Sequence, residues 1–540
     1  MSEYIKSQYV QSAGRPAKKP VHMQTYVRGY ANQSVTENGA VGYRTTTHPL
    51  LDMNFMVSSL RNRKEKEIGE MFAKAYYDSP KYAVKWAFFL RDICEGLGER
   101  RSFRVILQYL SICHPEVCSA VLELVPQYGR YDDWLCLLYT PVGNQVCQLI
   151  KEQLLADQKA MKEGRPVSLL AKWLPSINAS SYDTCADARH LARKLGMKAG
   201  EYRKALSALR AYSNVVEVKM SANNWSEIDY EKVPAKATMK YDDAFLRHDF
   251  ERRADYFRRV ISGDAQLNGK GIMPYEVVQR LKGGTGVLGR FALKDDLLAE
   301  LMWEHMTKQG FSNEWGIEDC IVVADGSGSM YTNVSGSSSV QAIDVCHSLA
   351  VYFAQQLKGV FHNKAITFSA HPQFIDLDMG KTLKEKLEIM HLHNEVANTN
   401  IEAVFDMLLD MALSHEVPVQ ELPKQLLIIS DMEFDRASVP GWRDESWEPM
   451  SEALFETIRQ RYEMAGYKVP RLIFWNVCGR SDTIPQVDNE EGICLLSGFS
   501  QNAMKIAADK EVKDPYESLL RLLDSPRYTP VEEALSELLT

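Results

Sequence analysis

The residues best suited to chemistry in this chain are Asp325, Ser327 and Ser329, which alternate with Gly326 and Gly328 directly after an apolar run. Alternation in a tight turn lets three short oxygen-bearing side chains converge on one point, and the two glycines permit such a turn. Hard oxygen ligands of this kind suit Mg²⁺ or Mn²⁺ much better than Zn²⁺. The D-x-S-x-S pattern therefore predicts a divalent-cation site at the end of a buried strand.

Two further oxygen-bearing residues stand at comparable places downstream. Thr399 comes just before an amphipathic segment, and Asp431 ends the apolar run Leu-Leu-Ile-Ile-Ser-Asp. In a parallel sheet, junctions between a strand and the following helix meet at one edge. We therefore expect one metal site built from three separate segments, with the side chains Asp325, Ser327, Ser329, Thr399 and Asp431.

The elements that must position these residues follow from the periodicity after about residue 315. Apolar runs typical of buried strands alternate there with segments of helical spacing. Strands are predicted at 320–324, 365–369, 373–377, 425–430, 471–477 and 492–497, and helices at 340–357, 383–390, 401–412, 446–465 and 502–508. This alternation indicates an α/β domain with a doubly wound, mostly parallel sheet, which binds ligands at the carboxyl ends of its strands.

The five oxygen-bearing residues resemble the metal-ion-dependent adhesion site of von Willebrand factor A domains. In that family two serines and a threonine bind Mg²⁺, directly or through water, so the resemblance implies that the two serines of the turn and Thr399 are ligands. The two aspartates of the family act largely through water or from behind the ligands, which is the role implied for both aspartates here. The chain departs from the family in Ala397-Asn398, where a glycine pair often stands, and in a long polar insertion at 331–339.

The ligand types favour binding over hydrolysis. Hydroxyl ligands leave the charge of a metal poorly neutralised, so the metal retains affinity for an anionic ligand such as an Asp or Glu of a partner. A hydrolytic site would need a placed base and often two metals about 3.5–4 Å apart, held by several carboxylates. Asp435 is the extra acid expected nearby, so a metal-dependent nuclease is the weaker alternative. His391 and His393 lack a third ligand and indicate a surface pair in preference to a zinc site.

The N-terminal half has a different pattern. From about residue 48, apolar residues recur at helical spacing in short segments that Gly, Pro, Asn or Asp separate. Helices are predicted near 68–75, 84–93, 103–113, 115–126, 130–138, 143–161, 185–195, 200–211 and 275–281. Short paired helices over more than 200 residues indicate an α-helical repeat domain, HEAT-like in type, for which an open solenoid and a closed ring both fit.

Two stretches of this half could suggest catalysis, but local rules favour structural roles. Residues 283–289 contain a formal G-x-G-x-x-G, yet a helix precedes it and no βαβ unit surrounds it, so we predict a flexible interdomain loop. Adjacent acids on a helix point apart, so Asp132 and Asp133 are expected to cap a helix and not to form an acid–base pair.

Four stretches of the N-terminal half carry a second resemblance, at 37–43, 91–100, 128–135 and 172–176. They are similar to the TROVE module of the Ro autoantigen family, whose members bind RNA, and more closely to an uncharacterised family of similar architecture in plants, bacteria and large viruses. In the Ro family a von Willebrand A domain closes a ring of helical repeats, RNA ends enter a basic hole, and structured small RNAs lie outside. The resemblance implies an RNA-binding scaffold of the Ro ribonucleoprotein type.

The charge distribution fits an anionic partner for the helical half. Residues 1–310 carry 45 Lys and Arg against 35 Asp and Glu, whereas residues 311–540 carry 18 against 36. For any single basic residue, a solvated helix face paired with acids is the simpler interpretation. The basic clusters nevertheless supply candidate contacts to single-stranded 3′ ends or small structured RNA, namely Arg61, Arg63, Arg91, Arg100, Arg101, Arg104, Arg130, Lys172, Arg189 and Arg193.

Length and composition define the remaining expectations. A chain of 540 residues exceeds a single core, so we predict an N-terminal arm at 1–30, the helical domain at 31–310 and the von Willebrand A-like domain at 315–540. No apolar run reaches 18 residues and the first residues lack an apolar signal region, so neither a membrane span nor secretion is expected. Ten scattered cysteines, among them Cys94, Cys136 and Cys478 in apolar stretches, indicate reduced core thiols in a cytoplasmic protein.

These observations support two main functional hypotheses. The first is a non-enzymatic RNA-binding scaffold that carries a Mg²⁺- or Mn²⁺-dependent ligand site on its α/β domain. The second is a protein-interaction module without RNA, in which the metal binds a carboxylate of an acidic protein partner and the helical half is a second docking surface.

Overall fold

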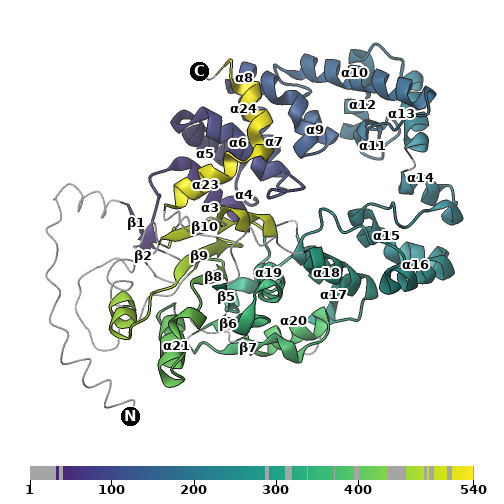
Figure 1. Cartoon of the computed structure of the whole chain (residues 1–540). Helices are drawn as coiled ribbons and strands as arrows, with labels where there is room; N and C mark the ends of the chain where they lie inside the picture. The colour runs from purple at the N-terminus through teal and green to yellow at the C-terminus, as the bar shows by residue number, and fades with distance from the viewer. Residues whose placement is uncertain are drawn as a thin grey trace.

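The computed structural model describes residues 32–35, 41–213, 215–285, 291–309, 319–336, 338–369, 371–394, 401–433, 458–479, 483–485, 492–507 and 514–538. Within these residues a helical part and an α/β part pack against each other (Figure 1). The expected combination of a helical domain with an α/β domain is therefore confirmed. Thr399, Asp435 and the arm at 1–30 lie outside the described residues.

A six-stranded sheet forms the centre of the α/β part. Its strands are β5 (Cys320–Asp325), β6 (Lys364–Phe368), β7 (Phe374–Asp376), β8 (Gln425–Ser430), β9 (Arg471–Asn476) and β10 (Ile493–Ser497), in the order β10-β9-β8-β5-β6-β7. Neighbouring strands are parallel except for β7, which pairs antiparallel with β6 at the edge. All six strands expected from the sequence are present in a mostly parallel sheet.

The order of the strands reverses between β5 and β8. From β5 the chain moves to β6 and β7 on one side, and then returns to build β8, β9 and β10 on the other. Ala324 of β5 pairs with Ile429 of β8, so Asp325 and Ser430 follow side by side at the carboxyl ends of these strands. Parallel sheets bind ligands at such a point of reversal, and the D-x-S-x-S turn begins there.

Four strands of this sheet are buried along their whole length, namely β5, β8, β9 and β10. Successive side chains of a strand point to opposite faces, so complete burial requires cover on both faces and explains the unbroken apolar runs. The covering helices include α19 (Ala342–Gln356), α20 (Leu383–Leu392) and α21 (Ile401–Ser414), as expected, and residues 458–464 are helical within the expected 446–465. The segment expected as a helix at 502–508 instead forms a 3-10 helix, η11 (Gln501–Ala507).

Sixteen helices follow one another in the described residues of the helical part, five of them with proline in the first turn, where its missing N–H costs nothing. They are α3 (Pro49–Phe55), α4 (Val57–Leu60), α5 (Glu65–Asp78), α6 (Pro80–Arg91), α7 (Arg101–Cys113), α8 (Pro115–Val121), α9 (Val125–Tyr128), α10 (Gly143–Lys162), α11 (Leu170–Trp173), α12 (Tyr182–Lys194), α13 (Ala199–Tyr212), α14 (Val216–Ser221), α15 (Ala235–His248), α16 (Phe250–Ser262), α17 (Pro274–Leu281) and α18 (Leu297–Gln309). The predicted helices are confirmed except at 130–138, where the chain forms a 3-10 helix, η2 (Tyr131–Leu137), and at 115–126, where the 3-10 helix η1 (Leu122–Leu124) separates α8 from α9.

Short strands occur at two places in this part. β1 (Gln33–Val35) pairs with β2 (Val41–Tyr43), and β3 (Lys282–Thr285) pairs antiparallel with β4 (Phe291–Leu293). The prediction of a flexible loop over the glycine-rich stretch at 283–289 is thus wrong for its first residues, because backbone pairing with β4 holds them in a strand.

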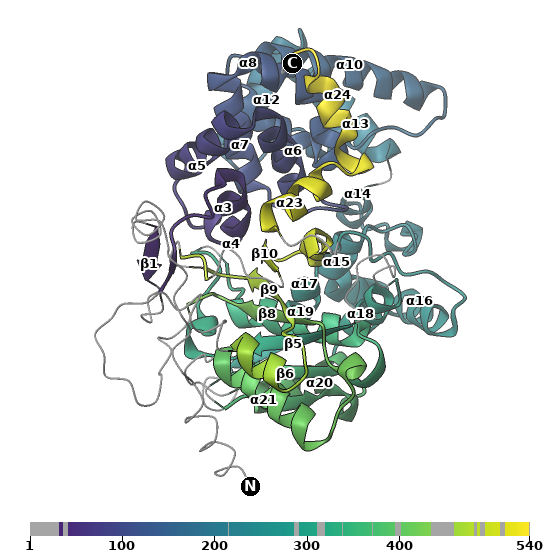
Figure 2. The ribbon, with the colours of Figure 1, turned by 60° about the vertical axis from the view of Figure 1, so that its left-hand side comes forward.

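Both ends of the helical series contact the α/β part. α3 packs against β10 at the start, and α17 packs against α19 at the end (Figure 2). At the first contact, Ser58 donates its hydroxyl to Asn476 at the carboxyl end of β9 at 2.9 Å, and its N–H to Ser497 at the end of β10 at 3.0 Å. The helical part therefore covers the same edge of the sheet at which Asp325 lies.

The C-terminal segment returns to the helical part. After β10 the chain forms α23 (Pro515–Leu523) and α24 (Thr529–Leu535), which pack against α6 and α8. Lys85 of α6 has an almost fully buried side chain and contacts Asp524 at 2.6 Å and Glu532 at 2.7 Å. The C-terminal segment and α6 therefore stabilise one another.

Arg527 joins this segment to a carboxylate with no exposed surface. It donates Nε to Asp92 Oδ2 at 2.7 Å and Nη2 to Oδ1 at 3.0 Å. Arg527→Ala is expected to lower the free energy of unfolding by about 2–4 kcal/mol, because it leaves a buried charge without its main partner. Urea unfolding checks this, with Arg521→Ala on the exposed face of α23 as the control, expected to change stability by less than about 0.5 kcal/mol. Equal effects of the two changes would contradict the assignment.

The membrane and thiol expectations can be compared with the described residues. Among them, no helix combines the length and the apolar character that a membrane crossing requires. All ten cysteines are free, and six are buried. Cys94 is an exception to the expectation of core thiols, because the turn after α6 leaves it exposed.

Candidate metal site

Asp325 is fully buried where β5 ends. Its Oδ1 accepts the backbone N–H of Ser327 at 2.9 Å, and its Oδ2 accepts the hydroxyl of Ser430 on the neighbouring strand at 2.6 Å. Burial raises the pKa of this carboxyl, and the charge of Asp431 raises it further, while the two hydrogen bonds act in the opposite direction. The carboxylate is thus held in place by two segments but lies in surroundings that disfavour its negative charge.

The two serines of the turn form a pair of adjacent oxygen donors. Ser327 is nearly buried, Ser329 is half-buried, and their Oγ atoms lie 2.9 Å apart. Neighbouring ligands of an octahedral Mg²⁺ at about 2.1 Å from the metal are separated by about 3 Å. The spacing of the hydroxyls therefore fits two neighbouring positions of such a cation.

Asp431 lies at the end of β8 with 1% of its surface exposed. Its Oδ1 accepts the backbone N–H of Glu433 at 3.2 Å. Met432 between them adopts φ of +64°, which non-glycine residues rarely adopt, and donates its N–H to the Ser430 hydroxyl at 3.0 Å. Strained backbone of this kind persists where the surroundings require it, and it often marks a functional site.

The oxygen donors present fit a hard divalent cation. Asp325 and Asp431 are both buried, and each negative charge disfavours the other. A cation close to both would remove this penalty, since an opposite charge favours the ionised form. No three His, Cys, Asp or Glu side chains of the described residues are grouped to hold a metal, so the fit relies on hydroxyl oxygens, which zinc and other softer metals do not favour.

Thr399 and the predicted histidine pair complete the list of sequence candidates near this edge. α21 begins at Ile401, so a helix follows Thr399 as expected, although the threonine lies outside the described residues. His391 packs its ring against His347 with centroids 4.8 Å apart, and His393 uses Nδ1 toward the carbonyl of Ile389 at 2.9 Å. His391 and His393 therefore contact different residues.

Side chains from two other elements support the D-x-S-x-S turn. Asn394 Oδ1 lies 3.2 Å from Nε2 of His347, which is buried in α19, and Asn394 Nδ2 donates to the Tyr331 hydroxyl at 3.2 Å. Burial and the nearby His391 lower the pKa of His347 well below its usual value, so its ring stays neutral. A Cβ at Gly326 would lie 2.6 Å from Asn394 Oδ1, so the glycine allows this close approach.

Gly326→Ala is expected to disturb the candidate cation site. The added methyl group overlaps Asn394, so either the turn or the asparagine must move, at a cost of about 1–2 kcal/mol in stability. Metal affinity, measured with Mn²⁺ by calorimetry, should fall about tenfold or more because the two serines shift with the turn. Gly336→Ala is the matched control, since a Cβ there meets no atom within 4 Å. Equal metal affinity of both variants would contradict the role of Gly326.

Three of the basic residues predicted to contact RNA form internal ion pairs. Arg91 has 2% of its side chain exposed and donates Nε to the buried Asp133 at 2.8 Å. Arg61 donates Nε to Glu99 at 3.0 Å, and Arg104 contacts the second oxygen of Asp133 at 2.7 Å. A phosphate cannot reach Arg91 in this structure, so we correct that prediction and assign it a structural role.

The other predicted RNA contacts lie closer to the surface. Arg100, Arg101, Arg189 and Arg193 are exposed, whereas Arg63, Arg130 and Lys172 are half-buried. Arg101 donates to the carbonyl of Leu60 at 3.2 Å and Lys172 lies 3.5 Å from Glu217. The structure brings Arg100, Arg104 and Arg130 together, while Arg189 and Arg193 lie on α12, a separate helix.

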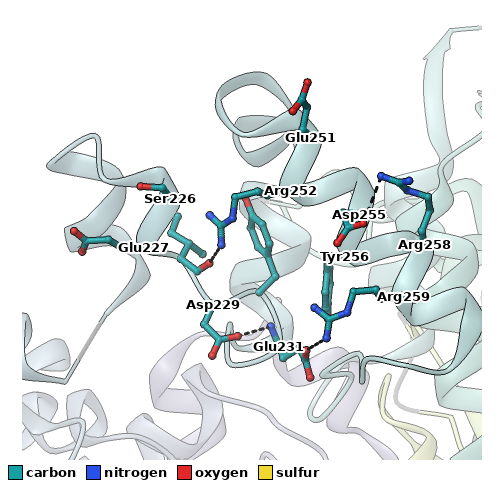
Figure 3. A pocket seen from close by; sticks show the side chains of 12 residues that line it. Ser226, Glu227, Asp229, Glu231, Glu251, Arg252, Asp255, Tyr256, Arg258 and Arg259 are labelled. Atoms are coloured by element: carbon teal, nitrogen blue, oxygen red, sulfur yellow. Dashed lines mark hydrogen bonds and ion pairs between the residues drawn. The ribbon is translucent and has the colours of Figure 1, made fainter.

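A cavity of about 550 Å³ lies between the 3-10 helix Trp225–Glu227, the loop that follows it and α16 (Figure 3). Its arginines already have partners: Arg252 donates to the carbonyls of Trp225 and Ile228, and Arg259 contacts Glu231 at 2.8 Å. The cavity therefore presents no arginine without a partner, and we give it no part in the function.

Sequence patterns missed several residues around the candidate cation site. Ser430 stands at the polar end of an apolar strand, which could have marked it. His347 is one of several polar residues in the mostly apolar helix α19, and Asn394 follows a helix end, so neither stands out by spacing. The contact between His347 and Asn394 arises only when α19 and α20 pack together.

Comparison with known proteins places both parts of the chain beside domains of unknown function. Residues 319–528 match the domain of unknown function DUF7788, and residues 36–140 and 187–312 match the domain of unknown function DUF2828. The chain is also similar to the uncharacterized protein L728 of Acanthamoeba polyphaga mimivirus, at 28% identity over 538 residues, covering 93% of this chain and 89% of the viral protein. The similarity to the viral protein thus extends over both the helical and the α/β part.

Proposed function

We propose that this protein is a non-enzymatic binding scaffold whose α/β part holds Mg²⁺ or Mn²⁺ and uses it to bind an acidic group of a partner. The observation that carries the proposal is the buried pair Asp325 and Asp431 beside the hydroxyl pair Ser327 and Ser329. The two serines would hold the cation, with Thr399 as the third hydroxyl implied by the von Willebrand A resemblance.

The roles of the protein groups follow from their positions. The two serines supply neutral oxygens, so most of the positive charge remains available to an incoming ligand. The two aspartates would balance part of the charge, which is the role that the von Willebrand A resemblance implies for them. When bound, the cation supplies a coordination position for a carboxylate of the partner. Within the described residues, Ser430 and Asn394 keep the turn in position.

The architecture that we propose is a von Willebrand A-like domain joined to a HEAT-like helical repeat, as in the Ro family. The reversal of strand order at β5 and β8, where the motif lies, supports the first assignment. The contacts of α3 with β10 and of α17 with α19 support a helical series that starts and ends on the α/β part, as a ring closed by that part requires.

A displayed library of random peptides tests cation-dependent binding. Peptides selected on the purified chain with Mg²⁺ or Mn²⁺ are expected to share an Asp or Glu and to be released by EDTA. Asp325→Ala should weaken their binding at least tenfold, a change of about 1.4 kcal/mol. Asp378→Ala, on the exposed turn after β7, is the matched control. Selected peptides that remain bound in EDTA would contradict the proposal.

RNA binding by the helical part is a second candidate function. It is supported by the excess of basic residues over residues 1–310 and by the exposed Arg189 and Arg193, which lie four residues apart on one face of α12. Filter binding of structured and single-stranded RNA over a salt series should show affinity that falls steeply with salt. Absence of binding at low salt would exclude RNA, and cleavage of the RNA with Mn²⁺ would instead favour a nuclease.

A further inference from the structure

Three arginine side chains surround one carboxylate near the surface of the helical part. Arg104 Nη2 lies 2.8 Å, Arg130 Nε 3.3 Å and Arg100 Nη1 3.9 Å from the oxygens of Asp132. Arg104 lies in α7, and Arg100 and Arg130 lie just before α7 and η2, so the cluster depends on the packing of these two elements.

Positive charge exceeds negative charge in this cluster. The neighbouring carboxylate of Asp133 is occupied by the buried Arg91 and by Nε of Arg104. Four guanidinium groups thus share two carboxylates. Burial lowers the pKa of Arg130, and the positive charges of Arg100 and Arg91 contribute to this lowering. An additional anion would relieve the repulsion.

The ion pairs with Asp132 do not satisfy the hydrogen-bonding geometry of this cluster. In the described part of the chain the side chains of Arg100 and Arg130 donate no hydrogen bond, and buried N–H groups of Arg104 (Nη2) and Arg130 (Nε) have no acceptor in good geometry. The side chain of Arg100 is 52% exposed, so solvent reaches the cluster.

One member of the cluster is fixed in orientation. The guanidinium of Arg130 lies over the ring of Trp173 at 4.2 Å, a cation–π contact that limits its rotation. The backbone N–H of Arg130 donates to Asp133 at 2.9 Å, and a Cβ at Gly129 would lie 2.4 Å from the same carboxylate. The donors of Arg130 are therefore held in place before any ligand arrives.

We propose that Arg100, Arg104 and Arg130 form a binding site for a phosphate group. Guanidinium forks match the oxygens of phosphate, and charge-assisted hydrogen bonds to them are about twice as strong as neutral ones. The phosphate can belong to a small ion or nucleotide or to the backbone of an RNA chain. The site lies on the helical part and does not depend on the cation site proposed above.

Calorimetry at constant ionic strength tests the site with two probes, inorganic phosphate and a short oligouridylate. The double change Arg100→Gln and Arg130→Gln is expected to weaken binding about 10- to 100-fold. Asp132→Asn should instead strengthen it about two- to fivefold, since it removes a competing negative charge. The matched control, Arg203→Gln with Arg258→Gln, removes two exposed arginines from α13 and α16.

The outcomes separate the sources of the phosphate. Cluster-dependent binding of phosphate alone supports a small phosphate ligand, and cluster-dependent binding of the oligouridylate supports an RNA backbone. The proposal is overturned if neither probe binds at about 10 mM, or if the control variant loses as much affinity as the cluster variant. Thermal unfolding of every variant establishes that each is folded under the conditions of the titration.

Discussion

Asp133→Ala is expected to lower the free energy of unfolding by about 3–5 kcal/mol. Asp133 is completely buried and contacts Arg91 at 2.8 Å and Arg104 at 2.7 Å. Removal of the carboxylate leaves the guanidinium of Arg91, which has 2% of its side chain exposed, without a partner in the core. A buried unpaired charge is among the most costly defects that one substitution can create.

Chemical denaturation measures this effect, and the neighbouring aspartate supplies the control. Asp132 is 15% exposed and its arginine partners lie closer to solvent, so Asp132→Ala should cost about 1 kcal/mol or less. The double variant Arg91→Met with Asp133→Leu should recover much of the loss, because an apolar pair needs no counter-charge. A similar stability loss for the two aspartate variants would show that burial of the Arg91 pair does not control stability here.

Asp325→Asn is expected to affect the stability of the protein differently with and without a divalent cation. Without a cation, the ionised carboxylate is unfavourable because it is buried beside Asp431, so the neutral amide should leave stability unchanged or raise it by about 1–2 kcal/mol. When the cation concentration is about 100 times the dissociation constant, the free energy of unfolding of the wild type should rise by about 2.7 kcal/mol. That of the variant should hardly change.

Thermal unfolding with EDTA and with excess Mg²⁺ measures both effects. Asp344→Asn is a useful comparison, because Asp344 is also buried but is paired with Lys282 at 2.6 Å. Loss of this ion pair should lower the free energy of unfolding both in EDTA and in Mg²⁺. The stabilisation that the cation provides should remain. If Asp325→Asn destabilises the protein in EDTA as strongly as Asp344→Asn, the aspartate has a structural role instead.

Local patterns predicted the elements of the α/β part because each strand and helix carries a strong period of its own. The apolar run Gln425–Ser430 and the alternation in Asp325 to Ser329 could be recognised without tertiary context. The order of the strands then follows from the rules of parallel sheets, so the meeting of Asp325 with Ser430 was within reach.

Contacts between distant segments could not be predicted in this way. Arg91 and Arg104 belong to a basic cluster in the sequence, but the fold buries one of them against an aspartate about 40 residues away. The packing of α24 on α6, and the ion pair of Lys85 with Asp524, join segments that are more than 400 residues apart in the sequence. Charge alone therefore suggested an RNA contact where the structure has a buried ion pair.

Titration of Mn²⁺ followed by electron paramagnetic resonance tests the central claim most directly, since the bound ion loses its free signal. Wild type is expected to bind one equivalent that Mg²⁺ displaces, whereas Ser327→Ala with Ser329→Ala should bind none at the same concentrations. Ser335→Ala with Ser339→Ala, from the polar insertion beside the turn, should behave like wild type. A wild-type chain that binds no Mn²⁺, or a Ser327 and Ser329 double variant that binds it unchanged, would contradict the cation site.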